Sequence, residues 1–428
     1  MRILNVTGEY PPMEGGVGAY TAQLVAALAA LGHENHVLTG CAPDLQPPER
    51  EADPGEGVTV HRTIKRWDVR GMAQVRRAIV RLAPDVINVQ FEPAAYGMKG
   101  AIYFLPRILG RATPPVIATF HDLLEPYLFP KAGRLRPWTV AQLARSAAGI
   151  IVTNQEDKDA VARILHTGGA VEGPPTLRLI PIGSNIVADP LPDFDRERWR
   201  KRYGLGRDDL VVSFFGFMNR TKGIETLLEA ASRINATRET GQRPVHLLFI
   251  GGRTGTSDVT NVRYADEVDA LITTLNLDAY VHRTGFAEPS EVSAAFYAAD
   301  LCALPYVEGA NLRHGTLHAA LTHGCPTITT TLGDETPELR DGEHVKLIPP
   351  EDSTALAEAI LTLAGNEALR RQLGRGGEML SRRFTWSRIA EDVAGLAEDV
   401  ADLTEDVALP KGPLPRHHGR IDDHDREP

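Results

Sequence analysis

The sequence predicts an α/β protein made of two doubly wound domains that face one another across a cleft, each a parallel sheet with helices on both faces. Three observations predict this class. The 428 residues exceed one ordinary core and suit two domains of roughly 150 to 200 residues each. Short runs rich in Val and Ile alternate with helical patterns along the chain. These runs are apolar throughout, as strands of a parallel sheet buried on both faces are.

Composition narrows the class of protein. Hydrophobic residues make up 43% of the chain and charged residues 24%, which is typical of a soluble globular protein. No apolar run is long enough to span a membrane, and the N-terminus lacks the apolar core of a signal peptide, so we expect a cytoplasmic protein. A net charge of −10 argues against a nucleic-acid binder. Cys41, Cys302 and Cys325 are too few and too scattered for a disulfide framework or a zinc cluster.

The first domain is expected over residues 1–190. It begins with a strand at "RILNV" and a helix around Ala19–Leu31. Further strands are predicted at "NHVLTG", "GVTVHR", "DVINVQF", "PVIATFHD" and "GIIVTN". The Pro-rich and charged segment "ADPLPDFDRERWRKRYGLG" then interrupts the alternation, as a linker followed by a solvated helix does.

The second domain, expected over residues 191–383, repeats the pattern. Its strands are predicted at "LVVSFFGF", "VHLLFIGG", "VHRTGF", "LCALPY", "CPTITTT" and "HVKLIPP". Helices are predicted at Ile224–Asn235, Tyr264–Leu275 and Ser290–Ala299, and another begins near residue 315. A long helical pattern occupies residues 384–404. Residues 405–428 contain few apolar side chains, which predicts a disordered tail.

Ligands bind at the carboxyl ends of the strands in such sheets, so residues there are candidates for the site. The turn "GEYPPMEGGVGAY" follows the first strand, and its glycines, Gly15 and Gly16 among them, allow a ligand to approach a helix N-terminus. The turn is as easily a bare turn as a site. Glu92 and His121 end neighbouring strands; Glu92 is expected to accept hydrogen bonds from hydroxyls or to cap a turn.

The stretch "GFMNRTKGIETLLEA" in the second domain carries a stronger signal. The first strand of the domain ends at Gly216, Asn219 follows, and Lys222 lies just ahead of the next helix. A lysine at a helix N-terminus opposes the helix dipole unless an anion lies between them. We therefore favour a phosphate ligand at Lys222 over a solvated lysine.

Residues 305–326, "PYVEGANLRHGTLHAALTHGCP", are predicted to form a strand end, a loop and a helix. The opening of that helix is either a phosphate site or simple packing. The backbone amides expected to be available to an anion are those of Gly315, Thr316 and Leu317.

Five segments carry a resemblance to a known family: "EYPPMEGGVGAY", "FFGFMNRTKGIETLLEA", "HGCPTITTTLGDETPELRDGEHVKLIPPED", "LAEAILTLAGNEALRRQLGRGG" and "FTWSRIAEDV". In this order they resemble family 4 of the retaining glycosyltransferases, which have the GT-B fold, over nearly the whole chain up to about residue 400. The resemblance implies transfer of a sugar from a nucleotide-sugar to an acceptor hydroxyl with retained anomeric configuration and without a metal or cofactor. It also implies an acceptor-side first domain, a donor-side second domain and a final helix that crosses back to the first.

The resemblance also assigns residues. It implies that Gly15 and Gly16 lie near the donor diphosphate and the transferred sugar, that Lys222 binds the diphosphate, and that His121 lies near the reacting centre. Such a site needs no strong general base if the departing diphosphate takes the acceptor's proton, and catalysis is then positioning and charge stabilisation.

The chain departs from its family at three positions. The usual arginine before the lysine is Phe217, and the usual pair of glutamates falls on Asn311 and Ala319. These changes indicate either a branch that uses other groups or a protein that has lost catalysis. We favour the first, with Arg313 binding phosphate oxygens in a fork and Glu308 replacing the lost sugar carboxylate.

The alternative for Arg313 is a salt bridge with Glu308 or Glu335. We expect His121, Lys222 and Arg313 to be the catalytic residues.

Two other functions remain open, an inactive nucleotide-sugar-binding regulator and a nucleotide-sugar hydrolase or epimerase. Arg283 and Phe286 are expected near the nucleotide base, but they do not distinguish UDP from GDP. Glu92 and Asp122 are expected on the acceptor side. The sequence does not identify the acceptor, which is a polysaccharide, a lipid-linked sugar or a small molecule.

Two basic segments suggest peripheral membrane contact. "KRWDVRGMAQVRRAIVRL" and "KAGRLRPWTVAQLAR" include Trp67 and Trp138 and are either membrane-facing or solvated amphipathic surfaces.

Overall fold

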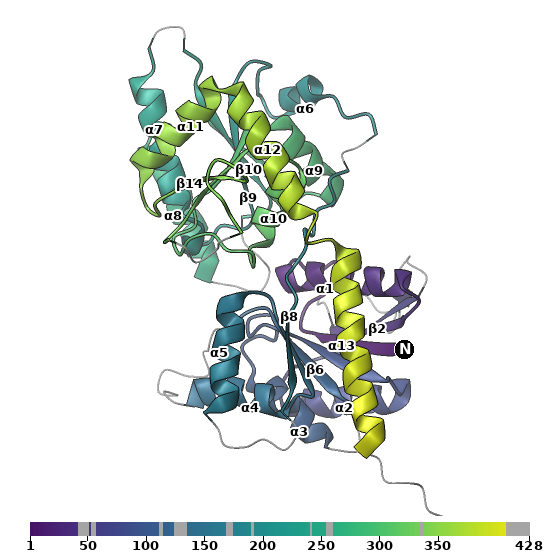
Figure 1. The fold of residues 1–428 in the computed structure, drawn as a ribbon. Coiled ribbons are helices and arrows are strands. Elements are labelled where there is room, and N and C mark those ends of the chain that lie inside the picture. The colour runs from purple at the N-terminus through teal and green to yellow at the C-terminus, as the bar shows by residue number, and fades with distance from the viewer. Residues whose placement is uncertain are drawn as a thin grey trace, which may run out of the picture.

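The computed structural model describes residues 1–41, 51–52, 57–110, 114–123, 135–167, 174–189, 192–239, 242–253, 260–333 and 338–407. Glu335 and residues 408–428 of the predicted tail lie outside these ranges. The described chain forms two α/β domains, each around a parallel sheet, as the sequence predicts (Figure 1).

The first domain contains an eight-stranded sheet with the order β3-β4-β2-β1-β5-β6-β7-β8. The strands are β1 (Arg2–Thr7), β2 (Glu34–Gly40), β3 (Glu51–Ala52), β4 (Val58–Ile64), β5 (Val86–Phe91), β6 (Val116–Phe120), β7 (Gly149–Val152) and β8 (Thr176–Leu179). All pairs are parallel except β3 with β4. The order reverses between β1 and β5, which places the crevice of the domain at the carboxyl ends of these two strands.

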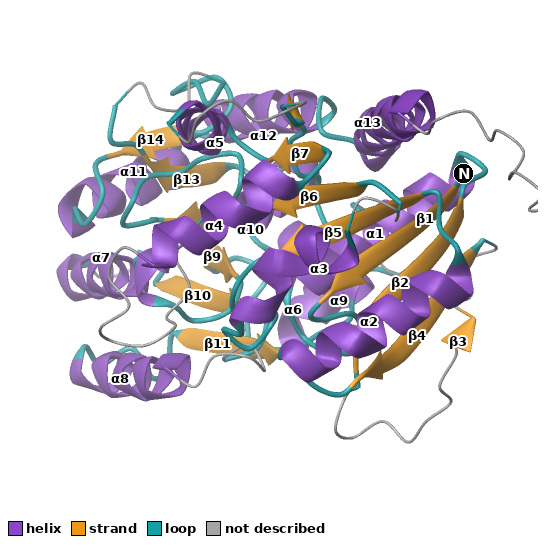
Figure 2. Ribbon diagram, turned by 90° about the horizontal axis from the view of Figure 1, so that it is seen from below, coloured by secondary structure: helices purple, strands orange, loops and turns teal. Residues whose placement is uncertain are grey.

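Helices cover both faces of this sheet. They are α1 (Gly16–Ala30), α2 (Val69–Leu82), the 3₁₀ helix η1 (Gly100–Phe104), α3 (Leu105–Leu109), α4 (Leu135–Ser146) and α5 (Gln155–His166). Alternate residues of β1 show the two layers, since Leu4 packs in the core under α2, η1, α3 and α4, whereas Ile3 packs in the core under α1. Figure 2 shows α2, α3 and α4 together on one side of the sheet.

The second domain contains a six-stranded sheet with the order β11-β10-β9-β12-β13-β14. The strands are β9 (Leu210–Phe215), β10 (Val245–Ile250), β11 (Val281–Gly285), β12 (Leu301–Leu304), β13 (Thr327–Thr330) and β14 (Lys346–Ile348). All of their pairings are parallel. The order reverses between β9 and β12, so a ligand crevice is expected at their carboxyl ends.

The helices of the second domain surround one large apolar core. They are α6 (Arg196–Arg202), the 3₁₀ helix η2 (Arg220–Lys222), α7 (Ile224–Thr237), α8 (Thr260–Thr274), α9 (Pro289–Ala298), α10 (Gly315–Thr322), α11 (Ser353–Gly365) and α12 (Glu367–Ser381). Buried Arg200 attaches α6 to this domain. Its guanidinium donates to the carbonyls of Ala298, Arg207 and Asp209 at 2.8 to 3.1 Å and to the Asp300 carboxylate at 2.8 Å.

The last helix, α13 (Trp386–Val407), returns to the first domain and packs against α1, as the resemblance implies (Figure 1). It continues through residues 405–407, which were predicted to belong to the disordered tail. The Trp386 indole N–H donates to the Ser184 carbonyl at 2.7 Å. A Cβ added to Gly183 would lie 2.8 Å from the Phe384 carbonyl oxygen, so the two chain segments that cross between the domains pack closely.

The predicted boundaries differ from the observed ones at helix N-termini. The helix expected from Ala19 begins at Gly16, and the helix expected from Tyr264 begins at Thr260. Each of these first turns contains one valine, Val17 or Val262, among glycine or polar residues, so apolar periodicity does not mark it. Helix α5 was not predicted, although Asn154, which accepts from the Asp157 N–H at 2.8 Å, is a recognisable N-cap in the sequence.

Candidate active site

Lys222 lies at the crevice of the second domain, where β9 ends beside β12. It ends η2, and Gly223, with a φ of 65°, leads directly into α7. Its Nζ donates to the Thr316 hydroxyl at 3.2 Å and lies 5.3 Å from the ring centroid of Tyr306. Burial lowers the pKa of Lys222 to about 8, and no carboxylate pairs with it within the described residues. An ammonium group in this position is available for an anion.

Gly216 is required at this place by its conformation and its neighbours. It follows β9 with a φ of 122°, and a Cβ there would lie 2.9 Å from Thr316 Cγ2 and 3.6 Å from Lys222 Nζ. Any side chain at Gly216 would therefore fill the space beside the ammonium group.

A stacked pair orients the start of α10. The rings of Tyr306 and His314 are nearly parallel, at an angle of 10° with their centroids 3.9 Å apart. The Tyr306 hydroxyl lies 2.6 Å from the Thr316 hydroxyl, which in turn contacts Lys222. Burial, together with the charge of Lys222, lowers the pKa of His314 to about 3, so His314 is neutral at physiological pH.

The helix N-terminus offers fewer amides than predicted. The Leu317 N–H donates to the His314 carbonyl at 2.9 Å, so the expectation that it is available to an anion is wrong. The first turn is tightened in the 3₁₀ manner, which uses this donor internally. The amides of Gly315 and Thr316 donate to no backbone or side-chain acceptor in the described part of the chain.

Arg313 makes the weak ion pair that was the alternative interpretation. Its Nη2 lies 3.7 Å from Glu308 Oε2, and the Glu308 side chain is 64% exposed. Such a pair contributes little and leaves the guanidinium free to exchange partners. Asn311, expected at the donor, accepts from the Arg313 N–H at 3.1 Å and so shapes the loop.

Three other residues predicted to bind the nucleotide-sugar donor are either paired with other side chains or exposed to solvent. Arg283 pairs with Asp269 at 2.5 Å, and Phe286 is 60% exposed. The Asn219 side chain accepts from the Thr221 N–H at 3.0 Å and caps η2. Arg220, just before Lys222, pairs with Glu267 and lies over the Tyr264 ring.

The glycine turn of the first domain surrounds a carboxylate that sequence reasoning missed. Glu9 is 4% exposed, and its Oε1 accepts from the N–H groups of Val17 at 3.0 Å and Gly18 at 3.1 Å. A Cβ added to Gly15 would lie 2.0 Å from that oxygen, whereas a Cβ at Gly16 would meet nothing within 4 Å. The anion position at the start of α1 is thus partly occupied by Glu9. The sequence does contain a signal for Glu9, because this residue follows the first strand and so lies at the carboxyl end of the sheet.

His121 lies at the carboxyl end of β6, as predicted. Its Nε2 is 2.9 Å from Gln90 Oε1, and the edge of its ring meets Tyr20 with the centroids 4.5 Å apart. Burial lowers its pKa to about 3. His121 is therefore a neutral hydrogen-bonding group rather than a general acid at physiological pH.

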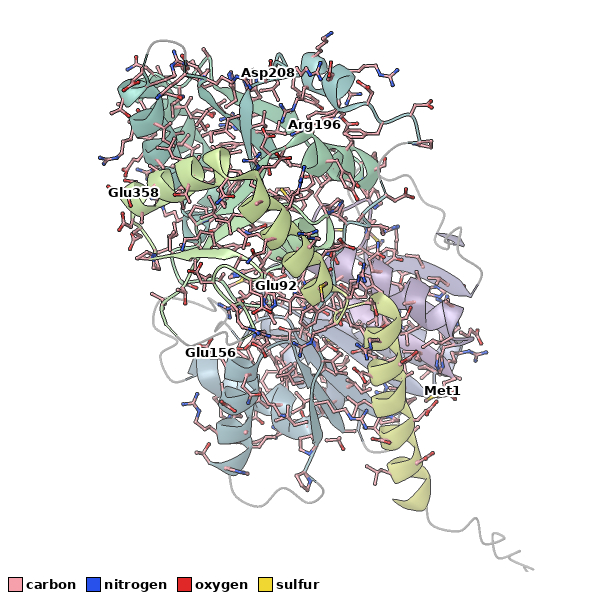
Figure 3. The ribbon with its side chains drawn as sticks, turned by 45° about the horizontal axis from the view of Figure 1, so that its top comes forward. Met1, Glu92, Glu156, Arg196, Asp208 and Glu358 are labelled. Carbon is pink, nitrogen blue, oxygen red and sulfur yellow. The ribbon has the colours of Figure 1, made fainter. Side chains whose placement is uncertain are left out.

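Glu92 and Asp122 follow β5 and β6 at the same edge, and Glu9 is close enough to act on Glu92. Burial, together with the charges of Glu9 and Asp122, raises the pKa of Glu92 to about 7. Figure 3 places Glu92 where the two domains meet. The first-domain side of the crevice is thus acidic, and one of its carboxyl groups titrates near neutral pH.

The two domains approach each other at this level. Glu14 Oε2 would lie 3.9 Å from a Cβ placed on Gly252, which follows β10, and the same Cβ would lie 3.2 Å from the Phe217 ring. Burial raises the pKa of Asp157 on α5 above its ordinary value. The charge of Arg313 partly offsets this rise, so Arg313 is close enough to act on Asp157. The loop that carries Arg313 therefore lies near the first domain.

A metal centre is not found in the described ranges, where no three histidine, cysteine, aspartate or glutamate side chains gather. Within the same ranges, no helix is both long and apolar enough to cross a membrane.

Comparison with known proteins finds one glycosyltransferase family model in each part of the chain. The family model for glycosyl transferases group 1 matches residues 209–366, and that for a glycosyl transferase 4-like domain matches residues 15–170. The phosphatidyl-myo-inositol mannosyltransferase of Mycobacterium leprae is 26% identical over 386 residues, 89% of this chain and 91% of the relative.

Solved structures have the same fold. Sucrose-phosphate synthase from Thermosynechococcus elongatus superposes with a TM-score of 0.72 at 21% identity, over 94% of this chain and all of the other. Anabaena HepE, solved with UDP-glucose, superposes with a TM-score of 0.69 at 20% identity, over 93% of this chain and all of the other. The chain thus has the GT-B fold, and its two domains match the family models for a glycosyl transferase 4-like domain and for glycosyl transferases group 1.

Proposed function

We propose that the protein is a retaining glycosyltransferase that moves a sugar from a nucleotide-sugar to an acceptor hydroxyl without a bound metal. The observation that carries the proposal is the placement of Lys222 Nζ 3.2 Å from the Thr316 hydroxyl, beside the unused amides of Gly315 and Thr316. A desolvated cation and two amide donors at a helix N-terminus form a site for a diphosphate.

These groups stabilise the charge that develops when the sugar leaves. The lowered pKa of Lys222 reflects burial without an anion, and a bound diphosphate would raise that pKa and be held by the ammonium group. Arg313 exchanges its exposed partner Glu308 for a phosphate oxygen, because a charge-assisted fork is stronger than a 3.7 Å surface pair. Glu308 is then released toward the transferred sugar, in the role that the resemblance gives to a glutamate.

The first domain positions the reacting groups. Neutral His121 hydrogen-bonds the transferred sugar, and Gly16, with open space beside it, admits the sugar to the start of α1. Glu92 and Asp122 bind acceptor hydroxyls. The departing diphosphate takes the acceptor's proton, so the site requires no further base.

The donor is a sugar nucleotide of the UDP or GDP class, with the base near Phe286. HepE, which shares the fold, was solved with UDP-glucose. The exposed Phe286 ring is available to stack on a base, whereas Arg283 has to leave Asp269 before it contacts one. The acceptor is a polysaccharide, a lipid-linked sugar or a small molecule.

A panel of nucleotide-sugars tests the function. Thermal shifts are measured for each UDP- and GDP-sugar, followed by detection of released nucleotide with and without candidate acceptors. A donor that raises Tm and is consumed only with an acceptor supports transfer, and the anomeric configuration of the product tests retention. Consumption without an acceptor would indicate a hydrolase. Binding without any turnover would indicate a regulator, and no shift with any donor would refute the proposal.

Arg313→Ala tests the diphosphate contact separately. It is expected to weaken donor binding by about tenfold or more, the usual effect of removing a charge-assisted hydrogen bond. Arg220→Ala is the matched control, because Arg220 is held by Glu267 outside this cluster. Equal donor affinity in wild type and Arg313→Ala would show that Arg313 does not bind the diphosphate and only forms a surface ion pair with Glu308.

A further inference from the structure

The outer surface of the first domain carries a patch that the reaction does not use. We call it the basic face. It consists of the exposed side chains of Val69, Arg70, Arg76, Arg77, Val80, Arg81, Arg107, Ile108 and Trp138. Helices α2, α3 and α4 supply them, and these helices lie on one side of the sheet (Figure 2).

Helix α2 forms the centre of the basic face, and its two sides differ sharply. Met72, Val75 and Ile79 are buried in the core at helical spacing. On the other side Val69 is 78% exposed and Val80 74% exposed. Arg70 lies close enough to Asp68, the N-cap of α2, for its charge to lower the pKa of that carboxyl group, but none of the four exposed arginines of α2 forms a salt bridge within the described residues. An amphipathic helix with arginine and valine on its outer side is unusual for a purely solvated surface, where paired charges are normal.

The basic face continues across α3 and α4. Trp138 is 46% exposed and lies 5.7 Å from the Phe104 ring, and Ile108 is 39% exposed beside Arg107. Helices α2 and α3 contact each other, as do α3 and α4. The segments 69–82, 100–109 and 135–146 contain no aspartate or glutamate. Exposed apolar and basic side chains therefore lie on neighbouring helices on this side of the domain.

The opposite side of the domain is acidic, which makes the basic face a local feature of an acidic protein. Helix α13 covers that side and exposes Glu391, Asp392, Glu398, Asp399 and Asp402. The whole chain has a formal net charge of −10. Because net charge does not attract the protein to anions, only an oriented approach through the basic face can bring it to an anionic surface.

We propose that the basic face docks on a lipid bilayer that carries anionic headgroups. Arginines attract such a surface, and exposed valine, isoleucine and tryptophan side chains enter its interfacial region. A nucleic acid would match the arginines but would leave four apolar side chains without a partner. The basic face excludes Trp67, which was expected to contribute, because Trp67 is 8% exposed and packs edge-on against Tyr96.

Vesicle co-sedimentation of the full chain tests the proposal without a sugar donor, so its outcome is separate from that of the proposed transferase reaction. Binding is expected to vesicles of equal parts phosphatidylglycerol and phosphatidylcholine and not to phosphatidylcholine alone, and to weaken with added salt. The double variant Arg76→Glu/Arg77→Glu is expected to lose affinity by about tenfold or more. The control Arg233→Glu/Arg375→Glu makes the same charge change in the second domain and should bind as wild type does.

The apolar contribution is tested by fluorescence and competition. Trp138 emission is expected to shift to the blue with anionic vesicles, and the shift should disappear in Trp138→Phe. Val80→Ser should weaken vesicle binding, and duplex DNA should not displace the vesicles. Absence of vesicle binding, an equal loss in the second-domain control, or tighter binding to DNA than to vesicles would overturn the proposal. Thermal melting of each variant verifies that it is folded.

Discussion

His121 Nε2 lies 2.9 Å from Gln90 Oε1 at the crevice, where Gln90 lies on β5 and His121 directly follows the neighbouring strand β6. The amide oxygen accepts, so Nε2 carries the proton and Nδ1 keeps its lone pair. Gln90 is 0% exposed, and its Nε2 has no partner in the described structure. Gln90 is thus a positioning residue that determines how His121 presents its ring.

Gln90→Glu is expected to raise the pKa of His121 above its present value of about 3, because a carboxylate stabilises the imidazolium. An NMR titration of the His121 ring measures it. Gln90→Met removes the acceptor without adding charge and should leave His121 neutral with a changed tautomer. An unchanged titration in Gln90→Glu would show that the two side chains do not pair in solution.

Lys222→Met is expected to have opposite effects on the free protein and on its complex. The folded-state pKa of Lys222, about 8, is below its unfolded value, so the buried charge destabilises the free protein below pH 8 and the cost disappears as the pH rises toward 10.5. The variant should therefore have a higher Tm at pH 7, by roughly 2 to 4 °C per kcal/mol relieved.

The same variant should lose most of the Tm increase caused by UDP or GDP. Thermal melting with and without nucleotide measures both effects. A lower Tm of the free variant would contradict the inference that Lys222 is an uncompensated cation.

Gly15→Ala is expected to destabilise the protein by about 1 to 3 kcal/mol. The added Cβ would lie 2.0 Å from the Glu9 carboxylate, which must then leave the amides of Val17 and Gly18. Gly16→Ala is the matched control, since a Cβ there meets nothing within 4 Å. Urea unfolding measures both. Equal stability of the two variants would show that Glu9 does not cap α1.

His318→Gln is expected to make the protein less sensitive to acid. His318 is 0% exposed, donates from Nε2 to the Leu312 carbonyl at 2.9 Å, and has its pKa lowered to about 4 by burial. A base with a depressed folded-state pKa stabilises the fold above its unfolded pKa of about 6.5, and that stability is lost as the pH falls.

Between pH 6 and pH 4 the free energy of unfolding of the wild type should fall by about 1.4 kcal/mol per pH unit because of His318. The variant should lack this contribution. Urea unfolding across this range checks the slope. His166→Gln, at an exposed position on α5, is the control and should keep the wild-type slope.

The sequence predicts most of the strands and many of the helices, because hydrophobic periodicity and composition depend on neighbouring residues. Apolar runs such as "VVSFF" identify strands buried on both faces, and their alternation with helices predicts parallel sheets. Lys222 was found in the same way, because its position ahead of α7 follows from the end of β9. Helix α5 and the starts of α1 and α8 were missed, since first turns rich in glycine or polar residues show no clear apolar period.

By itself the sequence predicted the two α/β domains and the strand ends at which Lys222 and His121 lie, and the family resemblance implied the returning helix α13. Only the tertiary structure decided how the polar groups share their partners. Glu9 occupies amides eight and nine residues further on, the Leu317 amide is consumed within its own turn, and Trp67 is buried against Tyr96. The physical reason is that strand and helix patterns arise from neighbouring residues, whereas hydrogen bonding and burial depend on groups that folding brings together from distant parts of the chain.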